Sequence, residues 1–404
     1  MDCKQDVHDL ALLGGRAAFD NELYVGRPNL PGRAAFLKRA GDILDRAWLT
    51  NNGTYVQQLE KMLAERTRVK HCIPMANGTI ALEVAIRALK LSGEVIVPSF
   101  TFIATAHALQ WLNITPVFCD VGPRTHNLDP ARVEELITPR TTGIIGVHLW
   151  GRCCDVEGLT AVARKHGLHL LFDAAHALGC SYQGRPVGGL GEAEVFSFHA
   201  TKFVNTFEGG ALATNNDTLA GVVRLMKNFG FSGYDEVRSV GTNGKMNEFS
   251  AAMGVTGLEH FEELIAHNRR NYDAYRRELI DVPGLSLLTY DEDEGGNFQY
   301  IVLEVASEAP LSRDDLMRIL HGERVIARRY FYPGCHQMEP YRTLYPEAGE
   351  RLPSTRRLAA SVLVLPTGTQ IGEEDIERIC AVIRFAMTRG VEVSARLRAM
   401  ERVP

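Results

Sequence analysis

Short apolar runs alternate with longer amphipathic stretches between about residue 55 and residue 260. The stretches with helical patterns are 56–66, 79–91, 103–112, 130–136 and 158–166. The apolar runs between and after them read HCIPMA, EVIVPS, PVFCDV, TGIIGVH, HLLFDAA, EVFSFH and GALATN. This alternation predicts an α/β fold with a mostly parallel seven-stranded sheet covered by helices on both faces. Ligands of such sheets bind beyond the carboxyl ends of the strands.

The chain of 404 residues is longer than a single hydrophobic core usually supports, so two domains are expected. After residue 260 the pattern changes to a long polar helix at 259–279, strand-like segments FQYIVLEV and VIARRYF, and helices at 312–320 and 373–389. We therefore expect an N-terminal segment and a large domain in residues 1–260, and a smaller α+β domain in residues 261–404.

Charge and composition exclude several classes of partner. The net charge of −5 gives no overall attraction to nucleic acid or to an anionic membrane. No apolar run approaches the ~20 residues that span a bilayer, and the N-terminus has no signal-peptide pattern. The eight cysteines form no CxxC pattern, and His148 with Cys153 and Cys154 is poorly spaced for chelation. We expect a cytoplasmic protein with no metal site.

Asp173 and Lys202 follow two successive strands of the predicted sheet. Asp173 closes the run HLLFD, and Lys202 lies in SFHATK, just before EGG. A carboxylate and an amine at neighbouring strand ends suit pyridoxal phosphate (PLP), because the amine can bind the cofactor aldehyde and the carboxylate can keep the pyridine nitrogen protonated. Taken singly, the aspartate would be a turn residue or helix cap, and the lysine a surface charge.

An anion-binding turn precedes this pair. Asn77, Gly78 and Thr79 follow a strand and open a helix, where backbone N–H groups favour a phosphate. The alternative is an ordinary helix cap. The glycines at 188, 189 and 191 lack the spacing of a dinucleotide loop and are interpreted as a simple loop.

The segments EVIVPSFTFIATAHA, GVHLWG, FDAAHALG, FSFHATK, EGG and GTNGKMNE resemble the DegT/DnrJ/EryC1/StrS family of sugar aminotransferases. LYVGRPN, NFGF, YPGCHQMEPY and LPTGT are most similar to desosamine-pathway members, which aminate C4 of dTDP-4-keto-6-deoxyglucose in deoxyaminosugar and antibiotic biosynthesis. The resemblance implies fold type I, the fold of aspartate aminotransferase, in a homodimer with shared active sites. It also implies PLP, with pyridoxamine phosphate as its intermediate form, L-glutamate as amino donor and a dTDP-linked sugar as acceptor.

The resemblance also implies roles for single positions. Lys202 matches the lysine that binds PLP covalently, and Asp173 matches the partner of the pyridine nitrogen. The other matched positions are Gly78, Thr79 and Ser197 at the phosphate, Phe102 on the ring, His176 near the phenolic oxygen, and Asn243 as a phosphate contact from the neighbouring subunit. His336 matches a substrate contact, within a segment, 328–336, that we expect to form the rim of a nucleotide groove.

Other interpretations remain at this stage. Phe102 could be core, His176 and Ser197 could satisfy local backbone groups, and Asn243 could be a turn residue. The acceptor could be a 3-keto sugar or a keto-cyclitol, and the protein could be a PLP-binding regulator, a dehydratase or a non-catalytic binding module. Relatives that act as dehydratases replace the lysine with histidine, so Lys202 favours transamination.

Overall fold

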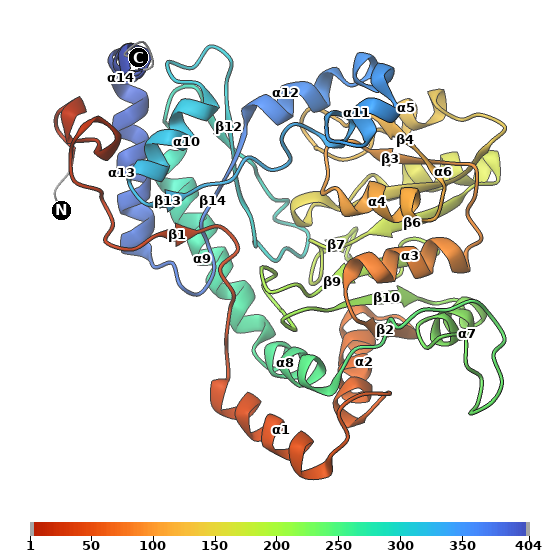
Figure 1. Cartoon of the computed structure of the whole chain (residues 1–404). Coiled ribbons are helices and arrows are strands. Elements are labelled where there is room, and N and C mark those ends of the chain that lie inside the picture. The colour runs from red at the N-terminus through yellow and green to blue at the C-terminus, as the bar shows by residue number, and fades with distance from the viewer. Residues whose placement is uncertain (1–3, 401–404) are drawn as a thin grey trace.

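All seven expected strands lie in one sheet of the computed structural model, which describes residues 4–400 (Figure 1). The strands are β2 (His71–Met75), β3 (Glu94–Pro98), β4 (Thr115–Cys119), β5 (Thr141–Val147), β6 (His169–Asp173), β9 (Ala193–Ser197) and β10 (Gly210–Thr214). Their order is β2-β10-β9-β6-β5-β3-β4, and only β10 runs antiparallel to its neighbours. The predicted α/β class is confirmed.

Helices cover both faces of this sheet because its strands carry apolar side chains on both sides. The helices of this region are α1 (Arg33–Arg46), α2 (Thr54–Thr67), α3 (Gly78–Ala88), α4 (Ala104–Trp111), α5 (Pro130–Glu135), α6 (Val156–His166), α7 (Asp217–Met226) and α8 (Glu248–Glu259). One face packs on α3, α4 and α7, and the other on α2, α5, α6 and α8. In β6, Leu171 faces the first set, whereas Leu170 and Phe172 face the second.

This alternation fixes where the last residues of two central strands point. Asp173 shares a face with Leu171, and Ser197 shares a face with Val195, so both side chains lie on the face that α3 and α4 cover. Because β6 and β9 run parallel as neighbours, their carboxyl ends meet at the same edge. The fold thus brings two of the expected site residues together.

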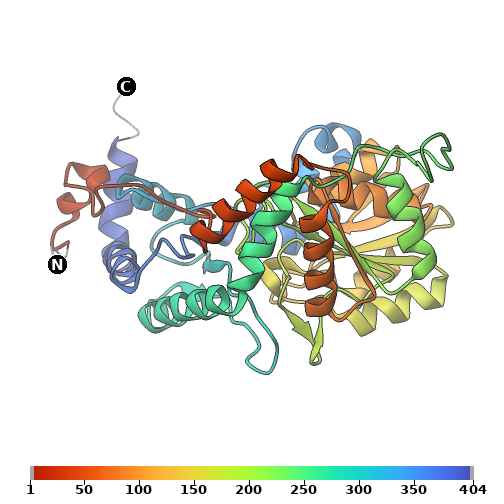
Figure 2. The ribbon, with the colours of Figure 1, turned by 90° about the horizontal axis from the view of Figure 1, so that it is seen from below.

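The C-terminal region is a separate α+β unit with its own core. Its strands β11 (Leu285–Leu287), β12 (Ile301–Val305) and β14 (Val362–Leu365) form an antiparallel sheet in the order β11-β12-β14. The remaining elements are α9 (Phe261–Leu279), α10 (Arg313–Gly322), β13 (Val325–Ile326), α11 (Tyr341–Leu344), α12 (Pro353–Ser361), α13 (Glu373–Thr388) and α14 (Gly390–Met400). Figure 2 shows this unit beside the large domain rather than on a face of its sheet.

Residues 7–24 of the N-terminal segment pack with the C-terminal unit. Strand β1 (Leu23–Tyr24) pairs in parallel with β13, and Val7, Leu10 and Phe19 enter the C-terminal core. The buried Glu323 carboxylate accepts the backbone N–H groups of Ala11 and Ala18, which fixes the segment there. These apolar side chains lose contact with water only through this long-range packing.

Two further strands, β7 (Ser181–Tyr182) and β8 (Arg185–Pro186), form a small hairpin beside the large sheet. The chain from 335 to 352 returns to the large domain, where Cys335, Tyr341 and Leu352 join the core under α3 and α4. Within residues 4–400, no helix combines the length and the apolar character needed to cross a bilayer.

Candidate active site

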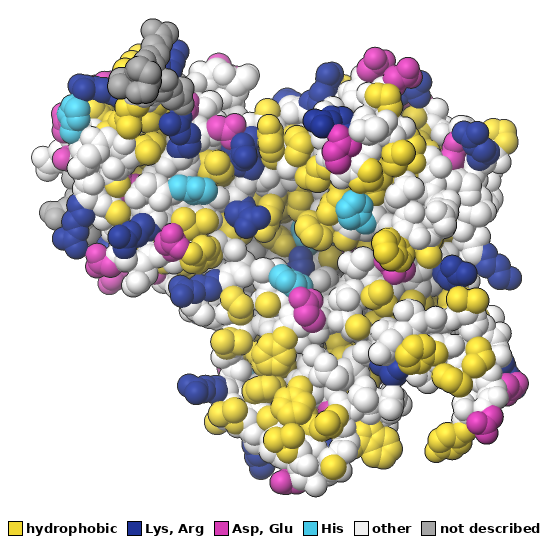
Figure 3. All heavy atoms as spheres, viewed as in Figure 1, with side chains coloured by type: hydrophobic (Ala, Val, Ile, Leu, Met, Phe, Trp, Pro, Cys, Tyr) yellow, Lys and Arg dark blue, Asp and Glu magenta, His cyan; other side chains and the backbone are white. Residues whose placement is uncertain are grey.

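A cavity of about 410 Å³ lies at the carboxyl ends of β6 and β9, between the large domain and the C-terminal unit. Figure 3 shows the hollow near the centre of this face, with basic, histidine and apolar side chains around it. Seven of the nine expected site residues line it, namely Gly78, Thr79, Phe102, Asp173, His176, Ser197 and Lys202. Residues as far apart in the chain as Gly78 and Lys202 therefore form one site.

The Asp173 carboxylate is held rigidly at the end of β6. Its Oδ2 accepts a hydrogen bond from the Thr105 hydroxyl at 2.8 Å, and its Oδ1 accepts one from the Ala175 N–H at 3.1 Å. Burial raises the pKa of the carboxyl, while these hydrogen bonds and the charge of Lys202 act in the opposite direction. A buried carboxylate of this kind gains from a cationic partner, such as a protonated ring nitrogen.

The Lys202 side chain reaches the cavity from the turn that follows β9. Its Nζ lies 3.1 Å from the hydroxyl of Tyr300, the residue immediately before strand β12 of the C-terminal unit. Burial lowers the pKa of the amine from its usual 10.5 to about 8, although the Asp173 carboxylate opposes this shift. At pH 7 about a tenth of the amine is therefore neutral, and this fraction can act as a nucleophile or base.

His176 is fixed in one tautomer by the backbone. The Trp150 N–H donates to its Nδ1 at 3.2 Å, so the proton of the neutral ring lies on Nε2. Burial lowers the pKa of the imidazole well below 6.5, and the charge of Lys202 adds to this, so the ring stays neutral. His176 can thus donate a hydrogen bond into the cavity.

The first turn of α3 provides an anion site. The Asn77 side chain caps the helix by accepting the Ile80 N–H at 2.8 Å, which excludes Thr79 as the cap. The N–H groups of Gly78 and Thr79 have no hydrogen-bond partner among residues 4–400 and lie at the cavity wall. A Cβ on Gly210 would lie 2.5 Å from the Gly78 nitrogen, which explains the second glycine of EGG.

Phe102 presents its ring to the cavity, because its side chain is 59% exposed and belongs to no core. Ser197 lies opposite the first turn of α3, where a Cβ on Gly78 would contact its own Cβ at 3.2 Å. The structure therefore places an aromatic face, two free helix N–H groups, a serine, a buried carboxylate and an amine around one space. This set fits PLP, which carries a ring, a phosphate, a basic ring nitrogen and an aldehyde.

Two expected residues do not line this cavity. Asn243 is exposed on a loop, and its Oδ1 accepts a hydrogen bond from Lys245 at 2.8 Å. His336 is 2% exposed, and its Nδ1 lies 2.7 Å from the Ser99 hydroxyl. The imidazole is thereby held at the joint between β3 and the returning C-terminal chain. From the expected rim at 328–336, the structure brings Arg328, Tyr330 and Phe331 to the cavity instead.

Two residues at the site have no clear signal in the sequence, and a third lies in the expected rim. Thr105 orients Asp173, Tyr300 contacts Lys202, and Arg328 adds a guanidinium that makes no ion pair among residues 4–400. Arg328 is the first residue of the rim that we expect at 328–336. Thr105 sits in FTFIAT, six residues after Ser99 and near the start of α4, and its side chain is fully buried, so only its helical phase could have indicated a role.

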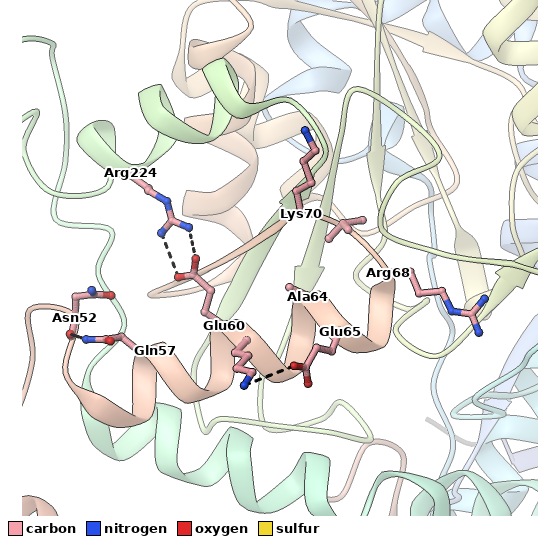
Figure 4. A pocket seen from close by; sticks show the side chains of 10 residues that line it. Asn52, Gln57, Glu60, Ala64, Glu65, Arg68, Lys70 and Arg224 are labelled. Atoms are coloured by element: carbon pink, nitrogen blue, oxygen red, sulfur yellow. Dashed lines mark hydrogen bonds and ion pairs between the residues drawn. The ribbon is translucent and has the colours of Figure 1, made fainter.

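Other hollows are less suited to chemistry. Figure 4 shows a more open one of about 590 Å³ on the outer side of α2, where the carboxylate of Glu60 pairs with Arg224 and that of Glu65 lies 3.9 Å from Lys61. Lys70 at its edge pairs with Asp217 at 3.0 Å. These charged side chains pair with one another, and the strand end nearest to Lys70 is the amino end of β2 rather than a carboxyl end. The cavity around Lys202 is therefore the candidate active site.

Known proteins resemble this chain over nearly its whole length. The crystal structure of DesI in the presence of its TDP-sugar product has 48% sequence identity and a TM-score of 0.92, covering 97% of this chain and 100% of that one. The dTDP-4-amino-4,6-dideoxy-D-glucose transaminase of Shigella dysenteriae is 38% identical over 366 residues, 90% of this chain and 99% of its own. The GDP-perosamine synthase of Caulobacter vibrioides is 35% identical over 350 residues, 85% and 92% of the two chains.

A model of one protein family matches residues 32–384, which include the whole cavity. The match spans both the large domain and most of the C-terminal unit. The chain therefore belongs to the DegT/DnrJ/EryC1/StrS aminotransferase family, which confirms the expectation of a PLP-dependent aminotransferase of fold type I.

Proposed function

We propose that the protein transfers the amino group of L-glutamate to C4 of a nucleotide-linked keto sugar, dTDP-4-keto-6-deoxyglucose. The observation that carries this proposal is the buried pair of Lys202 and Asp173 in a cavity whose fold matches DesI, a protein solved with its TDP-sugar product. The Shigella relative is named for the corresponding amino sugar. A 3-keto sugar or a keto-cyclitol is the alternative acceptor.

Each residue of the cavity has a separate task in this proposal. PLP, when bound, supplies the carbonyl that captures the amino group and an electron sink for negative charge at the donor Cα. Lys202 would bind the cofactor covalently and, once released, would move a proton from Cα of the donor to the former aldehyde carbon of the cofactor. Asp173 keeps the ring nitrogen protonated, and His176 donates a hydrogen bond through Nε2. Gly78, Thr79 and Ser197 hold the phosphate.

The nucleotide is assigned to a second hollow that continues from the cavity. This hollow has a volume of about 400 Å³ and shares Phe102, Arg328 and Tyr330 with the cavity. Arg329 and His321 lie farther along it. Because the chain has a net charge of −5, local hydrogen-bond donors must attract a pyrophosphate. One such donor is Arg328, which makes no ion pair within residues 4–400. This arrangement supports the expected nucleotide groove. Its basic group near the cavity is Arg328, whereas His336 does not line it.

The homodimer with shared sites remains a proposal that the surface supports. The loop between α7 and α8, which carries Asn243, extends away from the body of the chain in Figures 1 and 2. Exposed apolar side chains gather on this loop and around α1, where Figure 3 shows a yellow cluster; they are Leu37, Leu44, Trp48, Leu49, Phe229, Phe231, Tyr234, Val237 and Val240. A second copy of the chain would cover them.

The direct test uses the holoenzyme with dTDP-4-keto-6-deoxyglucose and glutamate. Mass spectrometry should detect an amino sugar, and NMR should place nitrogen on C4. Borohydride reduction should attach the cofactor to the peptide that contains Lys202. Nitrogen at C3 would move the function to the alternative acceptor, and a different labelled lysine would overturn the site.

A further inference from the structure

The Tyr300 hydroxyl is the only hydrogen-bond partner of the Lys202 amine among residues 4–400. The phenol is buried, with 8% of the residue exposed. Its ring centre lies 4.5 Å from that of His176 and 5.4 Å from that of Trp150. The backbone oxygen of Tyr300 also accepts the Tyr290 hydroxyl at 2.9 Å. The hydroxyl is thus held in place from several sides.

A phenol can form a hydrogen bond with an amine whether the amine is protonated or neutral. Its oxygen accepts a hydrogen bond from an ammonium, and its O–H donates one to a neutral amine. Because burial raises the pKa of Tyr300, the phenol stays neutral over the range in which Lys202, with a pKa of about 8, titrates. Tyr300 is therefore a fixed point of contact while the charge of the lysine changes.

We propose that Tyr300 is a positioning residue that holds the released amine of Lys202 within reach of the reacting carbon during both proton transfers. This proposal rests on the role assigned to Lys202 above. In the first transfer the Cα–H bond of the donor breaks, its electron pair stays with the substrate, and the proton passes to the neutral amine. In the second transfer the ammonium gives that proton to the former aldehyde carbon of the cofactor, and the amine is neutral again. Without Tyr300, the four-carbon side chain has no described partner that limits its motion between the two transfers.

The test replaces Tyr300 by phenylalanine, which keeps the ring and removes the hydroxyl. In the full-length holoenzyme, the single-turnover half-reaction with glutamate should slow by roughly 10- to 100-fold, the range carried by one hydrogen bond to a charged group. The primary isotope effect with α-deuterated glutamate should rise, because proton transfer becomes slower than the other steps. A purely structural role would not selectively raise this isotope effect.

A second measurement needs no cofactor. In the cofactor-free full-length chain, the pH dependence of Lys202 acylation, followed by mass spectrometry, reports the pKa of its amine. Tyr300→Phe should lower this pKa, since the hydrogen bond to the ammonium is the stronger of the two that the phenol makes. Tyr275→Phe is the matched control: its buried hydroxyl bonds to the Pro366 oxygen at 2.9 Å, far from Lys202, and its loss should change only stability.

Tyr300→His keeps a ring that can donate and accept, and it should recover part of the lost rate. An unchanged rate, isotope effect and lysine pKa in Tyr300→Phe would overturn the proposal, as would equal losses in Tyr275→Phe. If Tyr300→Phe does not fold, a folded Tyr300→His that is as slow as Lys202→Ala would also overturn it. Failure of the proposed function is a separate result, because it would appear as borohydride labelling at another lysine.

Discussion

Replacing Asp173 by asparagine removes one buried charge and preserves the shape of the side chain. The new Oδ1 can still accept the Ala175 N–H, and the Thr105 hydroxyl can rotate to accept from the new amide. An opposite charge at close range shifts a pKa by about 1 to 3 units, which corresponds to about 1.4 to 4 kcal/mol. The glutamate half-reaction should therefore slow by roughly 10- to 1,000-fold, with about 100-fold as the central expectation.

The assay is stopped-flow absorbance of the holoenzyme mixed with glutamate. Glu194→Gln is the matched control, because Glu194 is a carboxylate at 0% exposure in the neighbouring strand β9. Glu194 pairs in register with Phe172, on the sheet face away from the cavity. A normal half-reaction in Asp173→Asn would refute the reasoning, and so would an equal loss in Glu194→Gln, which would indicate a general effect of changing a buried carboxyl group to an amide.

The same charge should also act on Lys202: in the cofactor-free chain the pKa of its amine, about 8, should fall in Asp173→Asn, because the carboxylate favours the ammonium. Capture of PLP by the unmodified apo chain should rise about tenfold per pH unit up to about pH 8 and then level off, since only the neutral amine reacts; a rise that continues to pH 10 would contradict the lowered pKa. Mixing Lys202→Ala with Asn243→Asp should restore some activity if Asn243 completes the site of a second copy, and a fully active monomer by sedimentation would refute that assembly. His336→Ala should slow both half-reactions alike and lower the melting temperature, because the imidazole is buried against Ser99; a rise in KM for the sugar nucleotide alone would instead return His336 to the substrate groove.

The large domain was predictable because its information is local. Each of the seven strands is a short apolar run, and each helix between them has its own period, so the sheet follows from patterns only a few residues long. Asp173 and Lys202 were recognisable because parallel strands bring their carboxyl ends to one edge. The glycines of EGG were recognisable only through the family resemblance. The physical reason for a glycine at position 210 is its close approach to Gly78, and only the structure shows this contact.

The remaining features depend on contacts between distant parts of the chain. Tyr300 lies 98 residues after Lys202, immediately before β12, in a segment whose pattern indicates only a buried aromatic side chain. The pairing of Leu23 with Val325 and the packing of Val7 have no local signal, so the sequence pattern cannot indicate that this segment packs with the C-terminal unit. His336 has a motif that suggests substrate contact, yet its burial depends on a serine 237 residues earlier.

These long-range contacts have one consequence for the chemistry. The cavity lies where the large domain meets the C-terminal unit, and hydrogen bonds cross that joint at Lys202 with Tyr300, at Ser99 with His336, and at Asp120 with the first turn of α12. Burial by the joint is what lowers the pKa of Lys202, and the same burial is what makes a charge at Asp173 costly unless Thr105 and a cationic partner stabilise it. The acid–base properties of both residues therefore depend on closure of the joint. A substitution that loosens the joint should return the pKa values of Lys202 and Asp173 toward those of exposed side chains together, even where it touches neither residue.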